Sequence, residues 1–494
     1  MMPSVAEGGM EVPGSRQSNG ADLVARASAG ARLMTVRGVA MRVISVASNL
    51  LLLALVVPVE LGIFAVVFGI AGILHFSADL GFERALMRRR QEPTVEEYAA
   101  LSAIQLVVVS AAVLAGLLWP KLALGFGALD DRWHVWMLLM IASMASLAAG
   151  TGARIRLERR LEYPKLAAVD VGQVVLQNVG LVTFALLDRF ALGTFIVLGL
   201  TQVILNAALF LWSPGPLPSL RGIARLLPLA RGSAGYMSSN WAKIAAERAT
   251  PVIIANLFGL GLAGIWSFSF RLAQLLNVTF EGFRRAAVPA AALLAHDRAN
   301  LRRLATNTLR GTVRAAAPIA GLAFVTAPVL GILWPQWKDA VVLAQVSVLF
   351  FALAGVAGAT LEPVAVTLRG ARAAVGERIS NLVVCWAGLL LLAWTGGTQL
   401  AWIVAPSYLA PVVVLLLVTD RDVRPAWNPD LNRSLLSLAT GLGIYAFGRL
   451  TGLSVLVVAP LAAAGILIWL RPSRLLHGMR QLRRLGTQLA GGRP

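Results

Sequence analysis

Apolar residues occur in long runs that repeat along the whole chain, rather than in alternating or amphipathic patterns. Each run is close to the twenty residues that an α-helix needs to cross a bilayer. The chain is therefore predicted to be an all-α polytopic membrane protein with about fourteen transmembrane helices. We expect these spans at residues 34–57, 60–82, 98–118, 134–152, 166–187, 191–212, 235–258, 262–283, 315–334, 341–367, 379–396, 399–419, 434–449 and 453–470.

The longest polar break in the middle of the chain is a proline-rich stretch that divides it into two halves. Its prolines, expected to stop any helix from running through, are Pro214, Pro216, Pro218 and Pro228. We predict the following domains: an N-terminal tail at 1–33, a six-helix bundle at 34–212, a linker at 213–234, a second six-helix bundle at 235–419, two extra helices at 420–470, and a basic tail at 471–494.

The two halves resemble each other. An offset of 201 residues aligns Gly81–Arg84 with Gly282–Arg285 and Arg42 with Lys243, and a slip of one residue aligns Gly62 with Gly264. Several short matches in the same order indicate an internal repeat. Two pseudo-symmetric six-helix bundles with a substrate path between them are a transporter architecture.

The 44 Lys and Arg residues, which give a net charge of +20, cluster at one side of the predicted topology. Most lie in the N-terminal segment, the even-numbered junctions and the C-terminal tail. Those in the opposite loops are Lys121, Arg132, Arg189, Lys338 and Arg449. This bias follows the positive-inside rule and predicts that both termini are cytoplasmic. The excess charge is thus a signal of topology, and we expect no nucleic-acid partner.

Residues with catalytic chemistry are scarce. The chain has one cysteine, Cys385, four scattered histidines and no Walker A sequence. The glycines from Gly259 to Gly264 match the dinucleotide fingerprint by letter only, and we interpret them as a tight turn between two spans. We therefore predict no enzymatic activity, no cofactor and no metal site.

The predicted span 235–258 is unusual because it carries several polar residues. Asn240, Lys243 and Glu247 are spaced three and four residues apart, which places them on one helix face. Lys243 and Glu247 are expected to pair across one turn. A charge at the middle of a spanning helix costs about 2.5–3.5 kcal/mol on insertion scales, so such residues face a bundle interior or a water-filled path.

Cations inside the spans predict a site for an anion. Arg42 and Lys243 are equivalent in the repeat and are expected to face each other across the cleft, with Arg248 and Arg271 on neighbouring helices. Surplus positive charge at membrane depth favours a phosphate or diphosphate, which supplies the missing counter-charge.

Polar residues of other kinds suggest further roles. Asp79 and Glu83 lie one turn apart, where they either hold a proton or cation or pair with Arg84. Glu247 is the third candidate for ion coupling. The candidates for contact with sugar hydroxyls are Asn49 and Asn240, for which helix–helix hydrogen bonding is the alternative interpretation.

The motifs of both halves resemble those of the polysaccharide-biosynthesis (Wzx-type) oligosaccharide flippases over roughly residues 30–420. The residues that carry the resemblance are Leu61–Phe64, Ala78–Gly81, Arg154–Lys165, Gly235–Tyr236, Asn256–Gly259, Ala263–Arg271, Arg284–Pro289, Leu333–Trp337 and Leu368–Gly370. One position departs from the family, in which an acidic residue often stands where this chain has Lys243, and Glu247 is the nearest substitute.

The resemblance implies the fold of the multidrug, oligosaccharide-lipid and polysaccharide exporter superfamily, in which two bundles form a V. It implies a substrate of undecaprenyl diphosphate carrying an oligosaccharide repeat unit, moved across a bacterial inner membrane for exopolysaccharide, capsule or O-antigen lipopolysaccharide synthesis. Membrane lipids, a polysaccharide polymerase and chain-length proteins are the expected partners. The alternatives are a lipid II flippase, a multidrug antiporter of the same superfamily and, outside transport, a membrane glycosyltransferase or polymerase.

Overall fold

The computed structural model describes residues 37–425, except 39, 42, 80–81, 84–85, 87–91 and 161, together with 444–445 and 454–468. The regular structure of these residues is helical. The first described helical segment that is apolar is Val43–Leu55. The main helices that follow are α2 (Pro58–Asp79), α4 (Val95–Leu118), α6 (His134–Ser143), α7 (Leu147–Arg159), α8 (Tyr163–Leu186), α9 (Phe190–Trp212), α10 (Ile223–Ile244), α11 (Thr250–Phe258), α12 (Leu260–Gln274), α13 (Asn277–Leu293), α14 (Arg298–Leu333), α15 (Ala340–Arg369), α16 (Ala371–Trp394), α17 (Ala401–Val418) and α19 (Val455–Ile468).

Nine helices of the described chain are long and apolar enough to cross a membrane. The prediction of an all-α polytopic membrane protein is confirmed. The number of about fourteen spans stays a prediction, since the expected span 434–449 lies almost wholly outside the described residues.

Several boundaries differ from the sequence prediction: α14, for example, begins at Arg298 rather than at residue 315, and two others bear on the site. Helix α10 begins at Ile223, inside the stretch predicted as a linker, and contains Pro228. The prediction that this proline stops the helix was wrong, because a proline removes only one helical hydrogen bond, here to the carbonyl of Ala224, an exposed residue in the first turn. The predicted span 262–283 is divided between α12 and α13 at Leu275 and Leu276.

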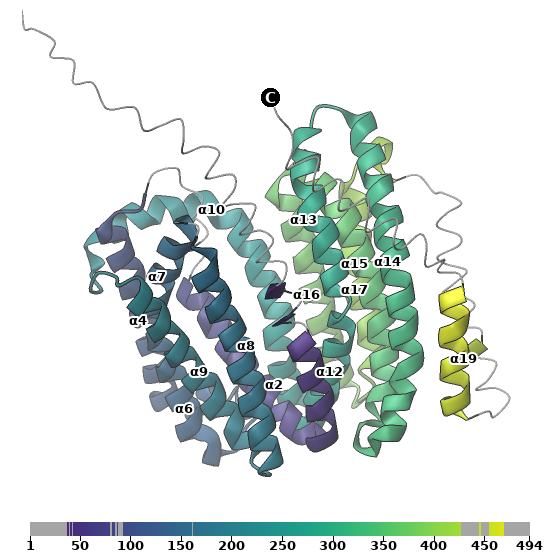
Figure 1. Ribbon diagram of the computed structural model, residues 1–494, viewed down its shortest axis with the longest axis horizontal. Helices are drawn as coiled ribbons and strands as arrows, with labels where there is room; N and C mark the ends of the chain where they lie inside the picture. The colour runs from purple at the N-terminus through teal and green to yellow at the C-terminus, as the bar shows by residue number, and fades with distance from the viewer. Residues whose placement is uncertain are drawn as a thin grey trace, which may run out of the picture.

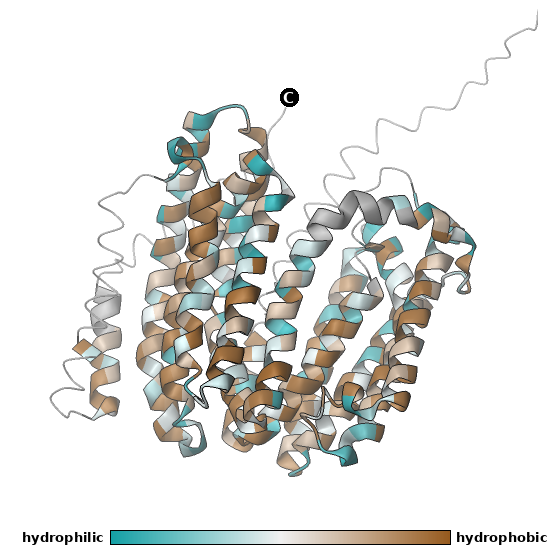
Figure 2. Cartoon of the chain, turned by 180° about the vertical axis from the view of Figure 1, so that it is seen from behind, coloured by the Kyte–Doolittle hydropathy of each residue, from teal (hydrophilic) through white to brown (hydrophobic). Residues whose placement is uncertain are grey.

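The helices form two groups that lie side by side (Figure 1). Helices α4 and α6 to α9 make the first group, and α13 to α17 make the second. Helices α2 and α12 pack against each other between the groups, at the lower end of Figure 1. Figure 2 shows that hydrophobic residues dominate along the helices, as expected for helices in lipid.

The contact between α2 and α12 depends on glycine. A Cβ atom at Gly62 would lie 2.0 Å from the Leu260 carbonyl oxygen, and one at Gly264 would lie 1.8 Å from the Pro58 carbonyl oxygen. Gly62 and Gly264 are the residues that the internal repeat aligns. Each glycine therefore receives the backbone at the start of the other helix, which is the reciprocal contact that a twofold relation produces.

A second contact joins the first described helix to the second group of helices. The carbonyl of Leu53 lies in the last turn of Val43–Leu55, where carbonyls lack helical donors. It accepts hydrogen bonds from Trp337 Nε1 at 2.9 Å and Gln336 Nε2 at 3.2 Å. Trp337 is almost completely buried. Both halves of the chain are thus joined near the α2–α12 contact.

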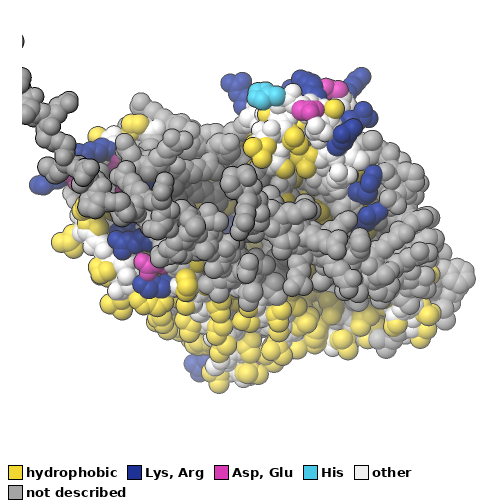
Figure 3. Space-filling model, turned by 45° about the horizontal axis from the view of Figure 1, so that its top comes forward, with side chains coloured by type: hydrophobic (Ala, Val, Ile, Leu, Met, Phe, Trp, Pro, Cys, Tyr) yellow, Lys and Arg dark blue, Asp and Glu magenta, His cyan; other side chains and the backbone are white. Residues whose placement is uncertain are grey.

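The opposite, upper end of the molecule carries many charged side chains. Helix α14 has 36 residues and is about 54 Å long, well beyond the ~30 Å of a hydrocarbon core, so one end projects from the membrane. Lys, Arg, Asp, Glu and His gather at this end, whereas hydrophobic side chains cover the flank below (Figure 3). There, the hydrogen bond from Arg369 lowers the pKa of Asp420, which also pairs with Arg298.

Candidate functional site

The predicted span 235–258, which carries the polar residues, belongs to a continuous helical segment. The pitch of this segment changes at the polar residues. Between α10 and α11 the chain makes one π-helical turn, η4 (Ala245–Ala249), which contains Glu247 and Arg248. Pro251 follows and has no N–H to donate to the Glu247 carbonyl, so a regular α-helical hydrogen bond is impossible there. Wide turns of this kind recur at functional sites, where they redirect side chains.

Arg248 and Arg271 lie at the same depth. Arg248 is ten residues from the end of α11 at Phe258, and Arg271 is eleven residues from the start of α12 at Leu260. At 1.5 Å per residue these separations are about 15 and 16 Å, half the thickness of a ~30 Å hydrocarbon core. Both arginines therefore lie about half a hydrocarbon thickness from the turn between α11 and α12.

These two arginines line one cavity of about 70 Å³, here called the interbundle cavity because α2 forms one wall and η4 and α12 form the other. Its remaining lining is mostly aromatic or small. It comprises Phe64, Ala65, Phe68, Gly69, Glu247, Pro251, Trp266, Ser267, Phe270 and Gln274.

Aromatic rings of α2 cover one face of each guanidinium group. Arg248 Cζ lies 4.1 Å from the centre of the Phe68 ring, and Arg271 Cζ lies 4.5 Å from that of Phe64. Such cation–π contacts hold the planar groups while leaving their N–H edges available. Gly72 makes room for the Arg248 side chain, whose atoms lie 3.1–3.2 Å from the position that a Cβ atom at residue 72 would occupy.

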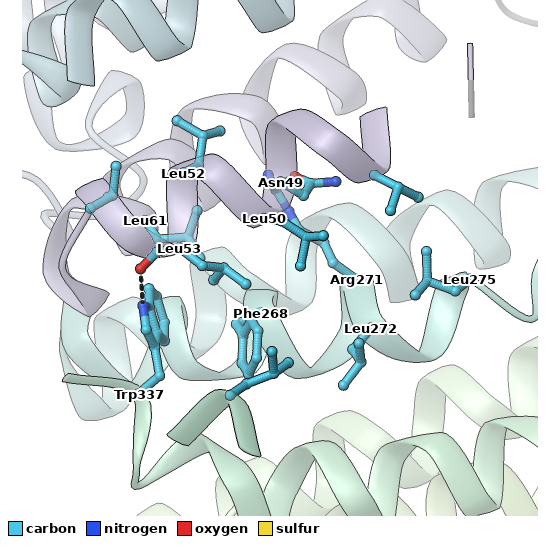
Figure 4. A pocket seen from close by; sticks show the side chains of 13 residues that line it. Asn49, Leu50, Leu52, Leu53, Leu61, Phe268, Arg271, Leu272, Leu275 and Trp337 are labelled. Carbon is cyan, nitrogen blue, oxygen red and sulfur yellow. Dashed lines mark hydrogen bonds between the residues drawn. The ribbon is translucent and has the colours of Figure 1, made fainter. Parts of the chain in front are cut away.

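Neither arginine has a carboxylate within 4.0 Å among the described residues. Arg271 donates from Nη1 to Asn49 Oδ1 at 2.9 Å, a neutral acceptor on the first described helix. Figure 4 shows Asn49 and Arg271 pointing toward each other beside the apolar cavity that Leu53 and Trp337 also line. The interbundle cavity therefore holds two guanidinium groups and a single carboxylate, that of Glu247, which also pairs with Lys243, so positive charge is in excess.

Lys243 does not line the interbundle cavity, and its predicted position opposite Arg42 stays a prediction because Arg42 lies outside the described residues. Lys243 lines a second cavity of about 150 Å³, here called the bundle cavity, which lies between α10 and η4 on one side and the second group of helices on the other. Its Nζ is 3.9 Å from Glu247 Oε1, which confirms the predicted pairing across one turn. Glu247 lines both cavities and so connects them.

An ion network that the sequence analysis missed lies beside the bundle cavity, which two of its members, Arg284 and Arg378, line. Glu362 accepts hydrogen bonds from Arg284 Nη1 and Arg378 Nη2, each at 3.1 Å, and Arg284 also pairs with Glu281. Glu377 lines the cavity, and its Oε2 is buried without a partner among the described residues. The signal for this network in the sequence was a pair of charged residues, Glu377 and Arg378, directly before the predicted span 379–396.

The other predicted site residues are scattered. Arg42 lies outside the described residues, and so does the side chain of Asp79, the last residue of α2. Glu83 is half-buried within the electrostatic range of Arg154. Asn240 is half-buried on α10 and lines neither cavity. Thus the described structure brings together Glu247, Arg248, Arg271 and, through Arg271, Asn49.

Residues 51–342, more than half of the chain, match the family model described as "Polysaccharide biosynthesis protein". The chain belongs to this family. The family match confirms the resemblance that the motifs of both halves indicated. No curated protein sequence gives a significant match.

Solved structures show which fold this polysaccharide biosynthesis protein has. Lipid II flippase MurJ in an inward closed conformation matches with a TM-score of 0.67 and 12% identity, covering 88% of this chain and 97% of that chain. An inward-facing multidrug resistance MATE transporter of the MOP superfamily matches with a TM-score of 0.57 and 14% identity, covering 76% and 92%. The protein therefore has the fold of the MOP-superfamily flippases and transporters.

Proposed function

We propose that this protein is a flippase that translocates undecaprenyl-diphosphate-linked oligosaccharide repeat units across the bacterial inner membrane. The polymer built from these units would be an exopolysaccharide, a capsule or an O-antigen. One observation carries the proposal. Two arginines without acidic partners among the described residues share a cavity between the two groups of helices, about half a hydrocarbon thickness from the turn between α11 and α12.

A diphosphate suits this cavity because it supplies the missing negative charge. An uncompensated Arg at the centre of a spanning helix costs about 2.5–3.5 kcal/mol on insertion scales, so a bound anion removes a substantial penalty. Guanidinium groups also bind phosphate oxygens through two parallel N–H donors. The phenylalanine rings and Asn49 hold Arg248 and Arg271 in place for such contacts.

The sugar units would extend from the diphosphate toward the bundle cavity. Glu247 borders both cavities, and Asn277 and Asn381 add amide groups to the bundle cavity, which suit sugar hydroxyls. Lys243 stands in the same lining and would contact the head group there. We assign Asn49 to positioning Arg271 rather than to contact with sugar.

Movement of the anionic head group does not require nucleotide. Each elementary charge that crosses a potential of 100 mV changes in free energy by about 2.3 kcal/mol, so an inside-negative potential favours outward movement of a diphosphate. Arg42, equivalent to Lys243 in the repeat, is a further proposed diphosphate ligand. Coupling to protons or cations through Asp79, Glu83 or Glu247 is a further proposal that transport in pH and sodium gradients tests.

The decisive experiment measures exchange of a fluorescent undecaprenyl diphosphate oligosaccharide between the leaflets of proteoliposomes, without nucleotide. We expect Arg248→Gln and Arg271→Gln each to slow exchange at least about tenfold, since a hydrogen bond to a charged group is worth about 1.5–3 kcal/mol. Arg132→Gln is the matched control, because Arg132 also stacks on an aromatic ring, Trp133, but is exposed. Wild-type rates in both cavity variants would exclude the anion site.

The same assay distinguishes the other transport functions. Exchange of lipid II in preference to the oligosaccharide lipid would indicate a lipid II flippase, and loss of the gene would then kill the cell. Transport of a cationic dye that no diphosphate lipid inhibits would indicate a multidrug antiporter. Elongation of the oligosaccharide would indicate a glycosyltransferase or polymerase.

A further inference from the structure

We propose that a crevice on the outside of the first group of helices binds the phosphate-bearing headgroup of a membrane lipid. The crevice, here called the flank cavity, has a volume of about 250 Å³. It lies between α4, α7, the last turn of α9 and the loop 213–218 that leads toward α10. Figure 1 shows α4, α7 and α9 on the side away from α14. The flank cavity shares no lining residue with the interbundle cavity.

Arg156 provides the positive charge of the flank cavity. Its Nε donates to Ser213 Oγ at 2.9 Å, its Nη2 donates to the Ser213 carbonyl, and its Cζ lies 5.0 Å from the centre of the Tyr98 ring. These partners are all neutral, and no described carboxylate lies within 4.0 Å. Arg154, two residues earlier, instead pairs with Asp170 at 2.9 Å and Glu158 at 3.4 Å.

The geometry fixes the Arg156 guanidinium group while leaving donors free. Nη1 makes no hydrogen bond to any described residue and is not buried. The Tyr98 side chain beside it is 5% exposed, and its hydroxyl is buried without a partner in the described chain. A buried hydroxyl without a hydrogen bond is costly, so a small local movement that brings an acceptor to it is favourable. A phosphate provides acceptors for both donors.

The rest of the flank cavity is apolar, as an amphiphile requires. Ala145, Ala148 and Ala149 of η2 and α7 form its wall, and Phe210 and Leu217 stand at its edge. Leu211, Trp212 and Leu217 are 76%, 43% and 87% exposed where α9 ends. Exposed residues of this kind, with tryptophan among them, are typical of the boundary between hydrocarbon and headgroups.

The loop 213–218 therefore lies at the level of the lipid headgroups, next to the fixed guanidinium group of Arg156. The cavity volume of about 250 Å³ leaves room for a phosphodiester and its first methylene groups. The linker is also fastened to α4, since Ser219 N donates to the Ala99 carbonyl at 3.0 Å. A lipid bound here would join α4, α7 and the connection between the two halves of the chain.

Native mass spectrometry of the full chain in detergent tests the proposal, with phosphatidylglycerol, phosphatidylcholine and inorganic phosphate as separate probes. We expect the wild type to retain one phospholipid and Arg156→Gln to reduce its occupancy about tenfold. Arg160→Gln is the matched control. It removes the same charge four residues after Arg156, and the Arg160 side chain does not line the cavity.

Tyr98→Phe keeps the ring and removes only the hydroxyl, so it tests the site even if Arg156→Gln fails to fold. We expect this variant to retain severalfold less phospholipid than the wild type. Equal retention by Arg156→Gln and Arg160→Gln would overturn the site. Binding of inorganic phosphate without retention of either phospholipid would overturn its assignment to lipid. Neither outcome depends on flipping, so the flippase proposal is tested separately.

Discussion

Glu377 lines the bundle cavity, and Glu362 binds two arginines of that lining, but the two carboxylates have different surroundings. Both oxygens of Glu362 accept hydrogen bonds from arginines, and its side chain is only 9% exposed. Glu377 has one oxygen buried without a partner among the described residues. Glu362 therefore neutralises Arg284 and Arg378. No described hydrogen bond joins the Glu377 carboxylate to an arginine.

The first prediction concerns this pair. Glu362→Gln removes the negative charge between two buried guanidinium groups, and breaking a buried ion pair costs about 3–5 kcal/mol. We expect a clear fall in the thermal unfolding midpoint of the purified protein. Glu377→Gln removes an equal charge from a neighbouring carboxylate and is expected to leave the midpoint unchanged or raise it. Similar losses in both variants would show that Glu377 also neutralises the arginines.

Sequence reasoning succeeded for residues close together along the chain and failed for distant ones. The pairing of Lys243 with Glu247 follows from helical spacing and is confirmed. Asn49 and Arg271 are 222 residues apart, and Glu362 and Arg284 are 78 apart, so no periodicity links them. Contacts of that kind depend on which helix faces meet, which local spacing does not specify.

At the scale of elements, glycine determines how closely α2 and α12 approach. Gly62 and Gly264 contact opposing backbone, and a Cβ at Gly69 would lie 2.4 Å from the Arg248 carbonyl oxygen. Small residues let membrane helices approach and gain dispersion contacts. The position of Arg248 beside Phe68 thus rests on the glycines of α2.

The second prediction tests this contact. Gly264→Ala places a methyl group against the Pro58 carbonyl and forces the helices apart. Overpacking of this kind typically lowers the free energy of unfolding by about 1–3 kcal/mol. We expect lower thermal stability and slower flipping. Gly261→Ala, on the same helix, meets only Val59 Cγ2 at an ordinary 3.8 Å and gains helix propensity. A stable, active Gly264→Ala variant would contradict the close contact.

At the scale of the whole molecule, the two groups of helices are joined at the end where α2, α12 and Trp337 meet. A transporter with alternating access must open and close this end during each cycle. The charged end, by contrast, carries the long α14 and its ion pairs with Asp420 and Asp422.

The third prediction is that a covalent lock at the joined end stops transport. The variant Val59→Cys with Gly261→Cys places two thiols on facing elements, where a Cβ at 261 would lie 3.8 Å from a Val59 methyl group. We expect oxidation to abolish flipping and reduction to restore it. Native Cys385 is buried and serves as the unreactive background, with each single cysteine variant as a control. Full activity after complete oxidation would show that this end does not open.

The sequence by itself determined the class of protein and the family, and it predicted the spans and the internal repeat, because these depend on runs of apolar residues and on local motifs. It also determined which charges lie within the spans. Only the tertiary structure decided which charges are neutralised. Lys243 has Glu247 beside it and the arginines near Glu362 have carboxylate partners, whereas Arg248 and Arg271 contact rings and Asn49 and have no carboxylate within 4.0 Å among the described residues. That outcome depends on which helix faces pack together, although they are far apart in sequence. The π-helical turn η4 sets the direction of the Arg248 side chain, and the glycine contacts set how closely the helices approach.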